Sequence, residues 1–466
     1  MKINNICCIG AGYVGGPTMA VIALKCPDIN VIVVDKNEDK IKAWNSDDVN
    51  QIPVFEPGLK EIIEKVRDKN LFFSTDIKEA IEKSEMIFLA VNTPTKTNGQ
   101  GKGMAADLTN IENSAREIAK FANNNKIVVE KSTLPVRTAE KLKEILEESS
   151  NKISFQVLSN PEFLAEGTAI KDLFNSDRVL VGGDQTKEGK KAIDALVDIY
   201  KNWIPEKKIL RSNVWSAELS KLASNAMLAQ RISSINSLSA VCAKTGADIL
   251  EVSKAVGADS RIGNSFLQPS VGFGGSCFQK DILNLVYLSK INGLPEVAEY
   301  WHQVVKINNY QRKRFVNLIL EKFENNIFNK TISLLGWSYK KDTNDSRESA
   351  SIYVAEMLLD EGAIIKIYDP KVSNSQILKD IENILILKDI NAQERTQIMN
   401  RVKIYNDVYQ SCLNTSAIAI LTEWNEFKNL DWLLIQEKMT DSYLIIDGRF
   451  IIPRNKLPKK LNLISI

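Results

Sequence analysis

The sequence predicts an α/β protein with two doubly wound domains joined by a long central helix in an all-helical segment. Short runs of β-branched residues alternate with helical patterns up to about residue 210, which is typical of βαβ units around a parallel sheet. A helical pattern without Pro or Gly then extends from about Val214 to Lys244, and Gly246 ends it. The last part of the chain returns to alternating strands and helices.

The predicted elements follow from these runs. In the first region the expected strands are Ile6–Ile9, Val31–Val34, Met86–Val91, Ile127–Val129, Phe155–Leu158 and Val179–Val181. In the last region they are Ile332–Leu335, Ile364–Tyr368, Ala417–Leu421 and Leu444–Ile446, with a helix around Ser351–Leu359. The central pattern would span roughly 45 Å as a helix, more than a small domain needs. We therefore expect a linker or subunit-contact helix there, and domains at 1–212, 213–325 and 326–466.

The composition excludes several classes of protein. The chain has 466 residues, 44% of them hydrophobic and 25% charged, and its near-neutral net charge of +2 argues against a nucleic-acid binder. No signal peptide and no apolar run of about 18 residues is evident, so we expect a cytoplasmic protein outside the membrane. Six scattered cysteines without a CxxC pair predict neither a disulfide framework nor a metal site.

The single histidine limits the chemistry. His302 lies in a helical pattern, where a structural role is the more common one, so acid–base groups are expected among Cys, Lys, Asp, Glu, Thr and Asn.

A glycine-rich turn follows the first predicted strand. Gly10, Gly12 and Gly15 permit a tight turn and a close approach to a pyrophosphate at a helix N-terminus. Asp35 ends the next strand, where a carboxylate binds ribose hydroxyls and repels a 2′-phosphate. The alternative is a plain tight turn, but the combination is typical of an NAD site. Nearby lysines such as Lys40 weaken the preference for NAD over NADP slightly.

Polar clusters follow three further predicted strands, at 91–95, 130–133 and 160–162. Ligands of open α/β sheets bind beyond the carboxyl ends of the strands, so we expect the clusters to converge on one crevice. Helix capping is the alternative, and it would account for Ser132 and Thr93 better than for Glu162.

The central helical pattern carries Lys221 and Asn225, whose spacing of four residues puts them on one helix face. Their neighbours are apolar, so Lys221 either extends to water or points into a site.

A second glycine-rich stretch, 266–281, holds the candidate nucleophile. Ser276 would cap the following helix and place Cys277 in its first turn, where the helix N-terminus favours a thiolate. Asp281 follows one turn later and could act as a base or order a water molecule. The alternative is a small buried cysteine after a glycine loop.

With these motifs in place, the chain closely resembles the UDP-glucose 6-dehydrogenases, notably the animal type, of the UDP-glucose/GDP-mannose dehydrogenase family. The resemblance extends from about Ile6 to Arg449. It is carried by the stretches CCIGAGYVGGPT, VNTPTKT, EKSTLPVR, LSNPEFLAEGTAIKDL, WSAELSKLASNA, AQRISSINS, VGFGGSCFQKD, KKDTNDSRES and YDPKV.

The resemblance implies two Rossmann-like domains and a four-electron oxidation of UDP-glucose to UDP-glucuronate by two NAD. Cys277 would carry first a thiohemiacetal and then a thioester. Lys221 would polarise the sugar oxygen and stabilise the oxyanion, and Asp281 would act as a base or orient water. The implied catalytic set also includes Glu162 and Thr133 for hydrolysis and proton transfer, and Asn225 beside them.

The resemblance also implies the binding residues. Its cofactor contacts correspond to Gly10, Ala11, Gly12, Tyr13, Val14, Gly15, Asp35, Lys40, Val91, Asn92, Thr93, Pro94, Thr95, Ser132, Thr133, Leu134, Glu166 and Arg347. Its substrate contacts correspond to Glu162, Phe163, Leu164, Ala165, Glu166, Lys221, Asn225, Arg261, Gln268, Ser270, Phe273, Gly274, Lys340 and Arg449. The last domain would hold UDP, and the chain would form a dimer or a trimer of dimers, with Arg261 reaching the sugar nucleotide of a neighbouring subunit.

Two departures from the family pattern concern affinity: Gln268 stands where a lysine is usual, and Lys40 replaces a usual arginine. Three other functions remain open from the residues. They are a two-step dehydrogenase of GDP-mannose or a UDP-N-acetylhexosamine, a one-hydride dehydrogenase that would not need Cys277, and a non-catalytic NAD-binding regulator.

Overall fold

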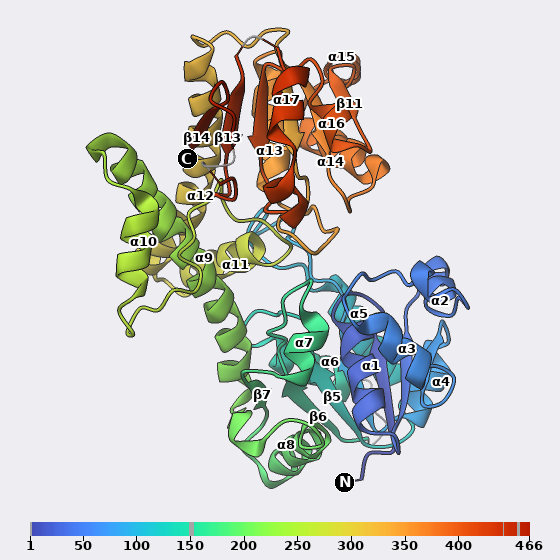
Figure 1. Ribbon diagram of the computed structural model, residues 1–466. Helices are drawn as coiled ribbons and strands as arrows, with labels where there is room; N and C mark the ends of the chain where they lie inside the picture. The colour runs from blue at the N-terminus through green and yellow to red at the C-terminus, as the bar shows by residue number, and fades with distance from the viewer. Residues whose placement is uncertain (1, 149–152, 441, 454–456) are drawn as a thin grey trace. The chain divides into compact units, whose positions relative to one another are not determined.

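The computed structural model describes residues 2–148, 153–440, 442–453 and 457–466. The chain divides into two compact units (Figure 1). The first comprises Met1–Ser224 and Leu283–Leu294, and the second comprises Asn225–Ile282 and Pro295–Ile466. The division falls inside the long helix α9 (Val214–Thr245). The bounds of α9 confirm the predicted central helix almost to the residue.

The first unit is built on an eight-stranded sheet with the order β3-β2-β1-β4-β5-β6-β7-β8. Its strands are β1 (Asn5–Ile9), β2 (Asn30–Val34), β3 (Leu71–Ser74), β4 (Met86–Leu89), β5 (Lys126–Glu130), β6 (Phe155–Ser159), β7 (Val179–Gly182) and β8 (Ile209–Ser212). The sequence patterns missed β3 and β8, which are four residues long and lie at the two edges of the sheet.

The prediction of an all-parallel sheet is wrong at one point. The pairings among β1 to β6 are parallel, but β7 runs antiparallel to β6, while β7 and β8 are parallel to each other. The connection from β6 to β7 contains only α7 (Ala169–Phe174), six residues long. A helix of that length advances about 9 Å, too little to return the chain along a whole strand before the next one begins.

Helices cover both faces of this sheet (Figure 1). One face packs against α1 (Gly15–Lys25), α3 (Leu59–Val66), α7 and α8 (Lys187–Tyr200), and the other against α4 (Ile77–Lys83), α5 (Thr109–Phe121) and α6 (Thr138–Glu148). The adjacent Cys7 and Cys8 of β1 face opposite sides, as expected for a strand, and each is buried in a different core. The short α2 (Glu38–Trp44) follows β2.

The second unit contains a parallel six-stranded sheet with the order β11-β10-β9-β12-β13-β14. Its strands are β9 (Thr331–Leu335), β10 (Ile364–Tyr368), β11 (Val402–Ile404), β12 (Ala417–Ile420), β13 (Leu444–Asp447) and β14 (Asn462–Ser465). The patterns predicted the four inner strands and missed the two edge strands, which are partly exposed and not continuously apolar.

The helices of the second unit again lie on both faces of its sheet. One core involves α12 (Pro295–Lys322), α13 (Ala350–Asp360) and α14 (Asn374–Leu387), and the other involves α16 (Val408–Ser411) and α17 (Trp432–Lys438). The remaining helices are α10 (Ile249–Gly257), α11 (Phe278–Ile291) and α15 (Ala392–Met399). The strand order, with the chain building outward on both sides of β9, confirms the doubly wound prediction.

Among the described residues, no helix combines the length and the apolarity that a membrane crossing requires.

Candidate active site

The turn between β1 and α1 leaves room for a ligand at one glycine only. A Cβ on Gly10 would lie 2.3 Å from the carbonyl oxygen of Ala90, and one on Gly15 would lie 1.9 Å from that of Gly10. Both positions therefore require glycine for packing, and Gly10 also has φ +113°. A Cβ on Gly12 would meet nothing within 4 Å. The backbone at Gly12 is thus open for the approach of a dinucleotide phosphate, and α1 begins directly after the turn.

Asp35 stands at the end of β2 with its carboxylate held in place. It accepts hydrogen bonds from the backbone N–H of Ala11 at 3.1 Å and of Asn37 at 3.0 Å, and it pairs with Lys40 at 2.8 Å. Burial raises the pKa of Asp35, but the Lys40 bond and the backbone donors outweigh burial, so the pKa is lowered. Asp35 is therefore ionised beside the glycine turn, as an acceptor for ribose hydroxyls must be.

The three polar clusters beyond β4, β5 and β6 come together. The hydroxyl of Thr93 donates to the carbonyl oxygen of Thr133 at 3.1 Å, and that of Ser132 donates to Val91 at 2.7 Å. Neither side chain caps a helix, so the capping alternative is wrong for both. They instead join the loops after β4 and β5. The third cluster is joined through the N–H of Asn160, which donates to the carbonyl oxygen of Glu130.

Glu162 is a buried carboxylate with an ion-pair partner that sequence reasoning missed. Its Oε2 lies 2.9 Å from Nζ of Lys131, and its Oε1 accepts the N–H groups of Phe163 at 2.7 Å and Leu164 at 2.9 Å. Burial raises the pKa of Glu162, but Lys131 and the hydrogen bonds lower it further, so the group is ionised. A lysine directly after a buried strand was the available signal for Lys131.

Lys221 of α9 lies close to the same loop. Its Nζ is 5.4 Å from the centre of the Phe163 ring, and its charge contributes to lowering the pKa of Glu162. The ring of Phe163 also stacks under the guanidinium of Arg178 at 3.9 Å. Lys221 is therefore buried beside this loop, with 7% of its surface exposed, and the alternative of a side chain extending to water is not realised.

The loop before Cys277 is held by the second unit's own side chains. Asn308 accepts the N–H of Phe273 at 2.8 Å, and both Asn308 and Arg312 donate to the carbonyl oxygen of Phe273. A Cβ on Gly274 would lie 2.5 Å from the carbonyl oxygen of Glu348, so this position needs glycine. The backbone of this glycine-rich loop is therefore tightly packed.

Cys277 occupies the N-cap of α11, which corrects the prediction that it lies in the first turn. The helix begins at Phe278, and the N–H of Asp281 donates to the carbonyl oxygen of Cys277 at 2.9 Å. The N–H of Gly275, two residues before Cys277, donates to the carbonyl oxygen of Arg347 at 2.9 Å. Cys277 is partly exposed while the other five cysteines are buried, and all six are free thiols.

Asp281 of α11 contacts Asn225 of α9, a pairing that the sequence patterns did not predict. Its Oδ2 accepts from Nδ2 of Asn225 at 2.6 Å, and its Oδ1 lies 3.4 Å from Nζ of Lys280. The Asp281 side chain is only 2% exposed, so its orientation is determined by these partners. A carboxylate thus lies one helical turn after the thiol of Cys277.

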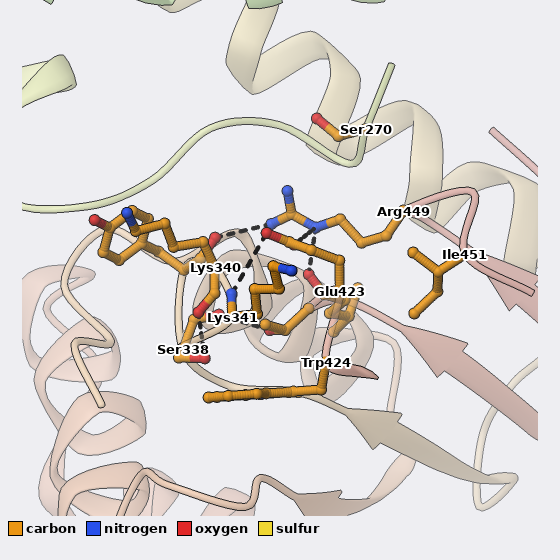
Figure 2. A network of polar contacts seen from close by, with 12 residues as sticks. Ser270, Ser338, Lys340, Lys341, Glu423, Trp424, Arg449 and Ile451 are labelled. Atoms are coloured by element: carbon orange, nitrogen blue, oxygen red, sulfur yellow. Dashed lines mark hydrogen bonds and ion pairs between the residues drawn. The ribbon is translucent and has the colours of Figure 1, made fainter. Parts of the chain in front are cut away.

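The cations predicted to bind the sugar nucleotide lie at the carboxyl ends of the C-terminal strands (Figure 2). Arg449 donates to the carbonyl oxygens of Leu421 at 2.7 Å and Tyr339 at 3.0 Å and pairs with Glu423 at 3.4 Å. Lys340 follows Tyr339 in the same loop and lies over its ring.

The other predicted binding residues of the second unit are dispersed. Arg347 pairs with Asp345 at 2.7 Å, and the 87%-exposed Arg261 pairs with Asp259 at 2.6 Å. Gln268 is exposed, and the buried Ser270 is fixed through its backbone by Asn236. Of the catalytic candidates, Thr133, Glu162 and Lys221 belong to the first unit, and Cys277, Asn225 and Asp281 to the second.

Three family models match the chain in order. They are those of the UDP-glucose/GDP-mannose dehydrogenase family for the NAD binding domain at residues 4–204, the central domain at 215–310 and the UDP binding domain at 333–454. The chain belongs to this family. It is an NAD-dependent oxidoreductase, which confirms the resemblance read from the motifs.

Individual relatives of this dehydrogenase family match over nearly the full length. UDP-glucose 6-dehydrogenase 4 of Arabidopsis thaliana is 56% identical over 97% of this chain and 94% of its own. UDP-glucose 6-dehydrogenase of Gallus gallus is 55% identical over 97% and 90%. A solved UDP-glucose dehydrogenase from Pyrobaculum islandicum has a TM-score of 0.84 at 28% identity, covering 98% of this chain and 96% of that one. The plant and animal relatives match equally well, so the likeness is not specific to the animal type.

The site residues fit the NAD that the family model implies. The open backbone at Gly12 and the ionised Asp35 are the two features that a dinucleotide needs at such a turn. Within the described ranges, no group of three or more His, Cys, Asp and Glu side chains is arranged to hold a metal ion.

Proposed function

We propose that this dehydrogenase oxidises UDP-glucose to UDP-glucuronate through a thioester on Cys277. The observation that carries the proposal is the placement of Cys277: it is the one cysteine that is not buried, and it caps a helix whose first turn contains Asp281. A helix N-terminus favours a thiolate, and a thiolate is both a good nucleophile and a good acyl leaving group. The names of the 54–56% identical relatives support UDP-glucose as the substrate.

The cofactor would be held by the turn from Gly10 to Gly15, by Asp35 with Lys40, and by the loops after β4 and β5. When bound, NAD accepts one hydride in each of two oxidation steps. The ionised Asp35 binds ribose hydroxyls and disfavours a 2′-phosphate, which favours NAD over NADP. Because Lys40 is already paired with Asp35, it offers little separate attraction for a 2′-phosphate.

The chain's residues would act on the sugar in four steps. Loss of a hydride and the hydroxyl proton turns the C6 alcohol into an aldehyde, with Lys221 stabilising the oxygen. The thiolate of Cys277 adds to the aldehyde carbon, and the aldehyde oxygen takes up a proton to form a thiohemiacetal. Loss of a second hydride and a proton gives the thioester. Water then cleaves the C–S bond, releasing the carboxylate, the thiolate and two protons.

The carboxylates of Asp281 and Glu162 would serve the proton transfers. Asp281, oriented by Asn225, takes up protons or orients water near the thiol. Glu162 and Thr133 assist hydrolysis from the first unit. Among the described residues the lone His302 lies on α12, away from these groups in the sequence, and the mechanism does not need it.

The residues that the family resemblance implies for UDP-glucose binding are Phe163, Leu164, Ala165, Glu166, Gln268, Ser270, Phe273, Gly274, Lys340 and Arg449. Arg261, exposed on its turn, would reach the site of a neighbouring copy in a dimer or a trimer of dimers. The proposed domains are residues 1–212, 213–325 and 326–466. The proposed location of the protein is the cytoplasm.

The first experiment counts NADH formed per sugar consumed by the purified protein with UDP-glucose, GDP-mannose or a UDP-N-acetylhexosamine. Two NADH per UDP-glucose are expected, with no turnover of the other two. Turnover of a UDP-N-acetylhexosamine instead would favour that substrate. A solved UDP-D-ManNAc dehydrogenase of Pyrococcus horikoshii has the same fold as this chain (TM-score 0.80, 24% identity). One NADH with an aldehyde product would remove the thioester step.

Cys277→Ser tests the nucleophile directly. We expect steady-state NADH production to fall at least about 1,000-fold while UDP-glucose binding is retained, because an alcohol is a far weaker nucleophile and leaving group. The matched control is Cys242→Ala, which removes a buried thiol of the second unit and should leave turnover unchanged. Normal turnover by Cys277→Ser would refute covalent catalysis.

A further inference from the structure

A buried ammonium group lies behind Glu162. Lys131 follows the last residue of β5, and its side chain is 4% exposed. Its Nζ lies 2.9 Å from Oε2 of Glu162, 3.1 Å from Oδ1 of Asn160 and 3.3 Å from the hydroxyl of Tyr200. Burial lowers the pKa of Lys131, but the neighbouring Glu162 outweighs burial and the pKa is raised. The side chain is therefore charged, with three partners that leave it no other orientation.

The neutral partners are themselves fixed by the sheet. Asn160 donates to the carbonyl oxygen of Leu180 in β7 at 2.8 Å, and Tyr200, at the end of α8, donates to Oδ1 of Asn160 at 2.7 Å. Burial raises the pKa of Tyr200, so the phenol remains neutral. Lys131 is thus supported by side chains from two other elements, and Glu162 is its one anionic partner in this network.

Glu162 in turn faces cations from two elements. Lys131 approaches from the end of β5, and the charge of Lys221 acts from α9. The other carboxylate oxygen is occupied by the N–H groups of Phe163 and Leu164. Glu162 therefore holds the loop that carries Phe163 in place, and its negative charge faces the charges of Lys131 and Lys221.

We propose that Lys131 is a positioning residue that keeps Glu162 ionised and its carboxylate oriented for the hydrolysis of the thioester. The inference rests on the proposed function for the role of Glu162. Lys131 touches neither cofactor nor substrate in this account, because its Nζ is enclosed by Glu162, Asn160 and Tyr200. An ionised Glu162 orients the attacking water by accepting a hydrogen bond. A protonated Glu162 would donate one instead and could not activate the water.

The ionisation of Glu162 can be measured without turnover. Infrared difference spectra of Lys131→Met against the wild type at pH 7 should show the carbonyl band of a protonated carboxyl group. The band should be absent in the double variant Lys131→Met/Glu162→Gln, which also replaces the buried ion pair by a neutral pair and so protects the fold. Absence of the band in a folded Lys131→Met protein would overturn the proposal.

Kinetics separate positioning from a general loss of structure. Lys131→Met should still release a burst of two NADH per subunit, because both oxidations precede hydrolysis, and then turn over at least about 100-fold more slowly at pH 7. Its rate relative to the wild type should recover about tenfold between pH 7 and pH 9, as Glu162 loses its proton again. The KM for UDP-glucose should change less than about threefold.

The matched control is Lys126→Met, which removes the buried lysine at the start of β5. Lys126 donates to the carbonyl oxygen of Ser84 at 2.7 Å and does not contact Glu162. The turnover rate of Lys126→Met relative to the wild type should not vary with pH, even if the variant is less stable. The same pH-dependent recovery in Lys126→Met would overturn the proposal.

The double variant provides the decisive comparison. Glu162→Gln and Lys131→Met/Glu162→Gln should have the same rate within about threefold, because Lys131 acts through Glu162. A further loss of tenfold or more in the double variant would show another role for Lys131 and overturn the proposal. A wild type that makes no NADH from UDP-glucose would instead refute the proposed function, while the infrared result would still decide how Lys131 affects Glu162.

Discussion

In each of the two sheets a glycine directly follows the first strand in the sequence, Gly10 after β1 and Gly336 after β9, but the turns that follow differ. In the first turn the backbone at Gly12 is open, and Asp35 accepts two backbone N–H groups beside a cation. In the second turn, the position equivalent to Gly12 is the fully buried Ser338, and a Cβ on Gly336 would lie 2.4 Å from Cβ of Thr422.

The carboxylates that follow β2 and β10, those of Asp35 and Asp369, also differ. Asp369 accepts from the N–H groups of Trp337 at 2.6 Å and Ser338 at 3.0 Å, from those of Lys371 and Val372, and from Nε1 of Trp424. The protein itself thus fills the second turn. A shared framework therefore does not imply a shared ligand: the first turn is built to receive one, and the second is built to hold its own loops together.

The largest effect expected from this difference is on stability. Asp369→Ala leaves several buried donors without an acceptor, and we expect the free energy of unfolding to fall by more than about 3 kcal/mol. Asp35→Ala, the matched change in the first unit, should cost less than about 1 kcal/mol, because Asp35 accepts only two backbone N–H groups and that of Asn37 is exposed. Denaturant titrations of the two variants give the comparison, and equal losses would contradict it.

Gly12→Val should block the cofactor while leaving the fold intact. The space at Gly12 is free of protein atoms, so stability should change by less than about 0.5 kcal/mol. The added side chain occupies the approach of the pyrophosphate, and the Kd for NAD should rise at least 100-fold, or about 2.7 kcal/mol. Calorimetric titration with NAD measures this. Unchanged binding would place the dinucleotide elsewhere.

A smaller effect is expected on cofactor choice. Asp35→Ala removes the acceptor for ribose hydroxyls and releases Lys40, so kcat/KM for NAD should fall about tenfold or more and the ratio of NADP to NAD use should rise. Because the pKa of Asp35 is lowered, its carboxylate persists from neutral pH down through mildly acidic pH. The KM for NAD should therefore be insensitive to Asp35 between pH 6 and pH 9. A rise in KM with falling pH that Asp35→Ala abolishes would contradict this.

The smallest effect concerns a buried carboxyl pair found in the first unit, Glu130 and Glu218. Glu218 accepts the N–H groups of Arg137 and Ala139 near the start of α6, at 2.8 Å each. Burial raises the pKa of both groups, and the nearby Glu218 raises that of Glu130 further. The folded protein therefore binds protons that the unfolded chain has already released.

Because the pKa of each carboxyl group is higher in the folded state, protonation stabilises the folded protein. This contribution is fully present below the ordinary glutamate pKa of about 4.3, and it is lost as the pH rises through the pKa values of the folded state. Between pH 5 and pH 8 the wild type should lose on the order of 1–2 kcal/mol that Glu130→Gln does not lose. Denaturant midpoints at the two pH values test this. Parallel losses in both proteins would show that the pair does not share a proton across this range.

Features encoded by neighbouring residues could be predicted from the sequence. The glycine turn with Asp35, the central helix and the inner strands follow from local spacing and from continuous apolar runs. Edge strands such as β3 and β14 could not be recognised, since partial exposure removes the apolar signal. The strand β7 was predicted, but its antiparallel direction was not, because strand direction depends on the path of the connection and not on the residues of the strand itself.

The sequence by itself determined the class of fold, the cofactor turn and the candidate nucleophile, since each depends on residue types at short fixed spacings. Only the tertiary structure decided which charges meet. Lys131 and Glu162 are paired because β5 and β6 are adjacent parallel strands whose carboxyl ends lie at the same edge. The same holds for Asp281 and Asn225, which two different helices bring together. Such contacts depend on strand order and helix packing, and no local pattern records them.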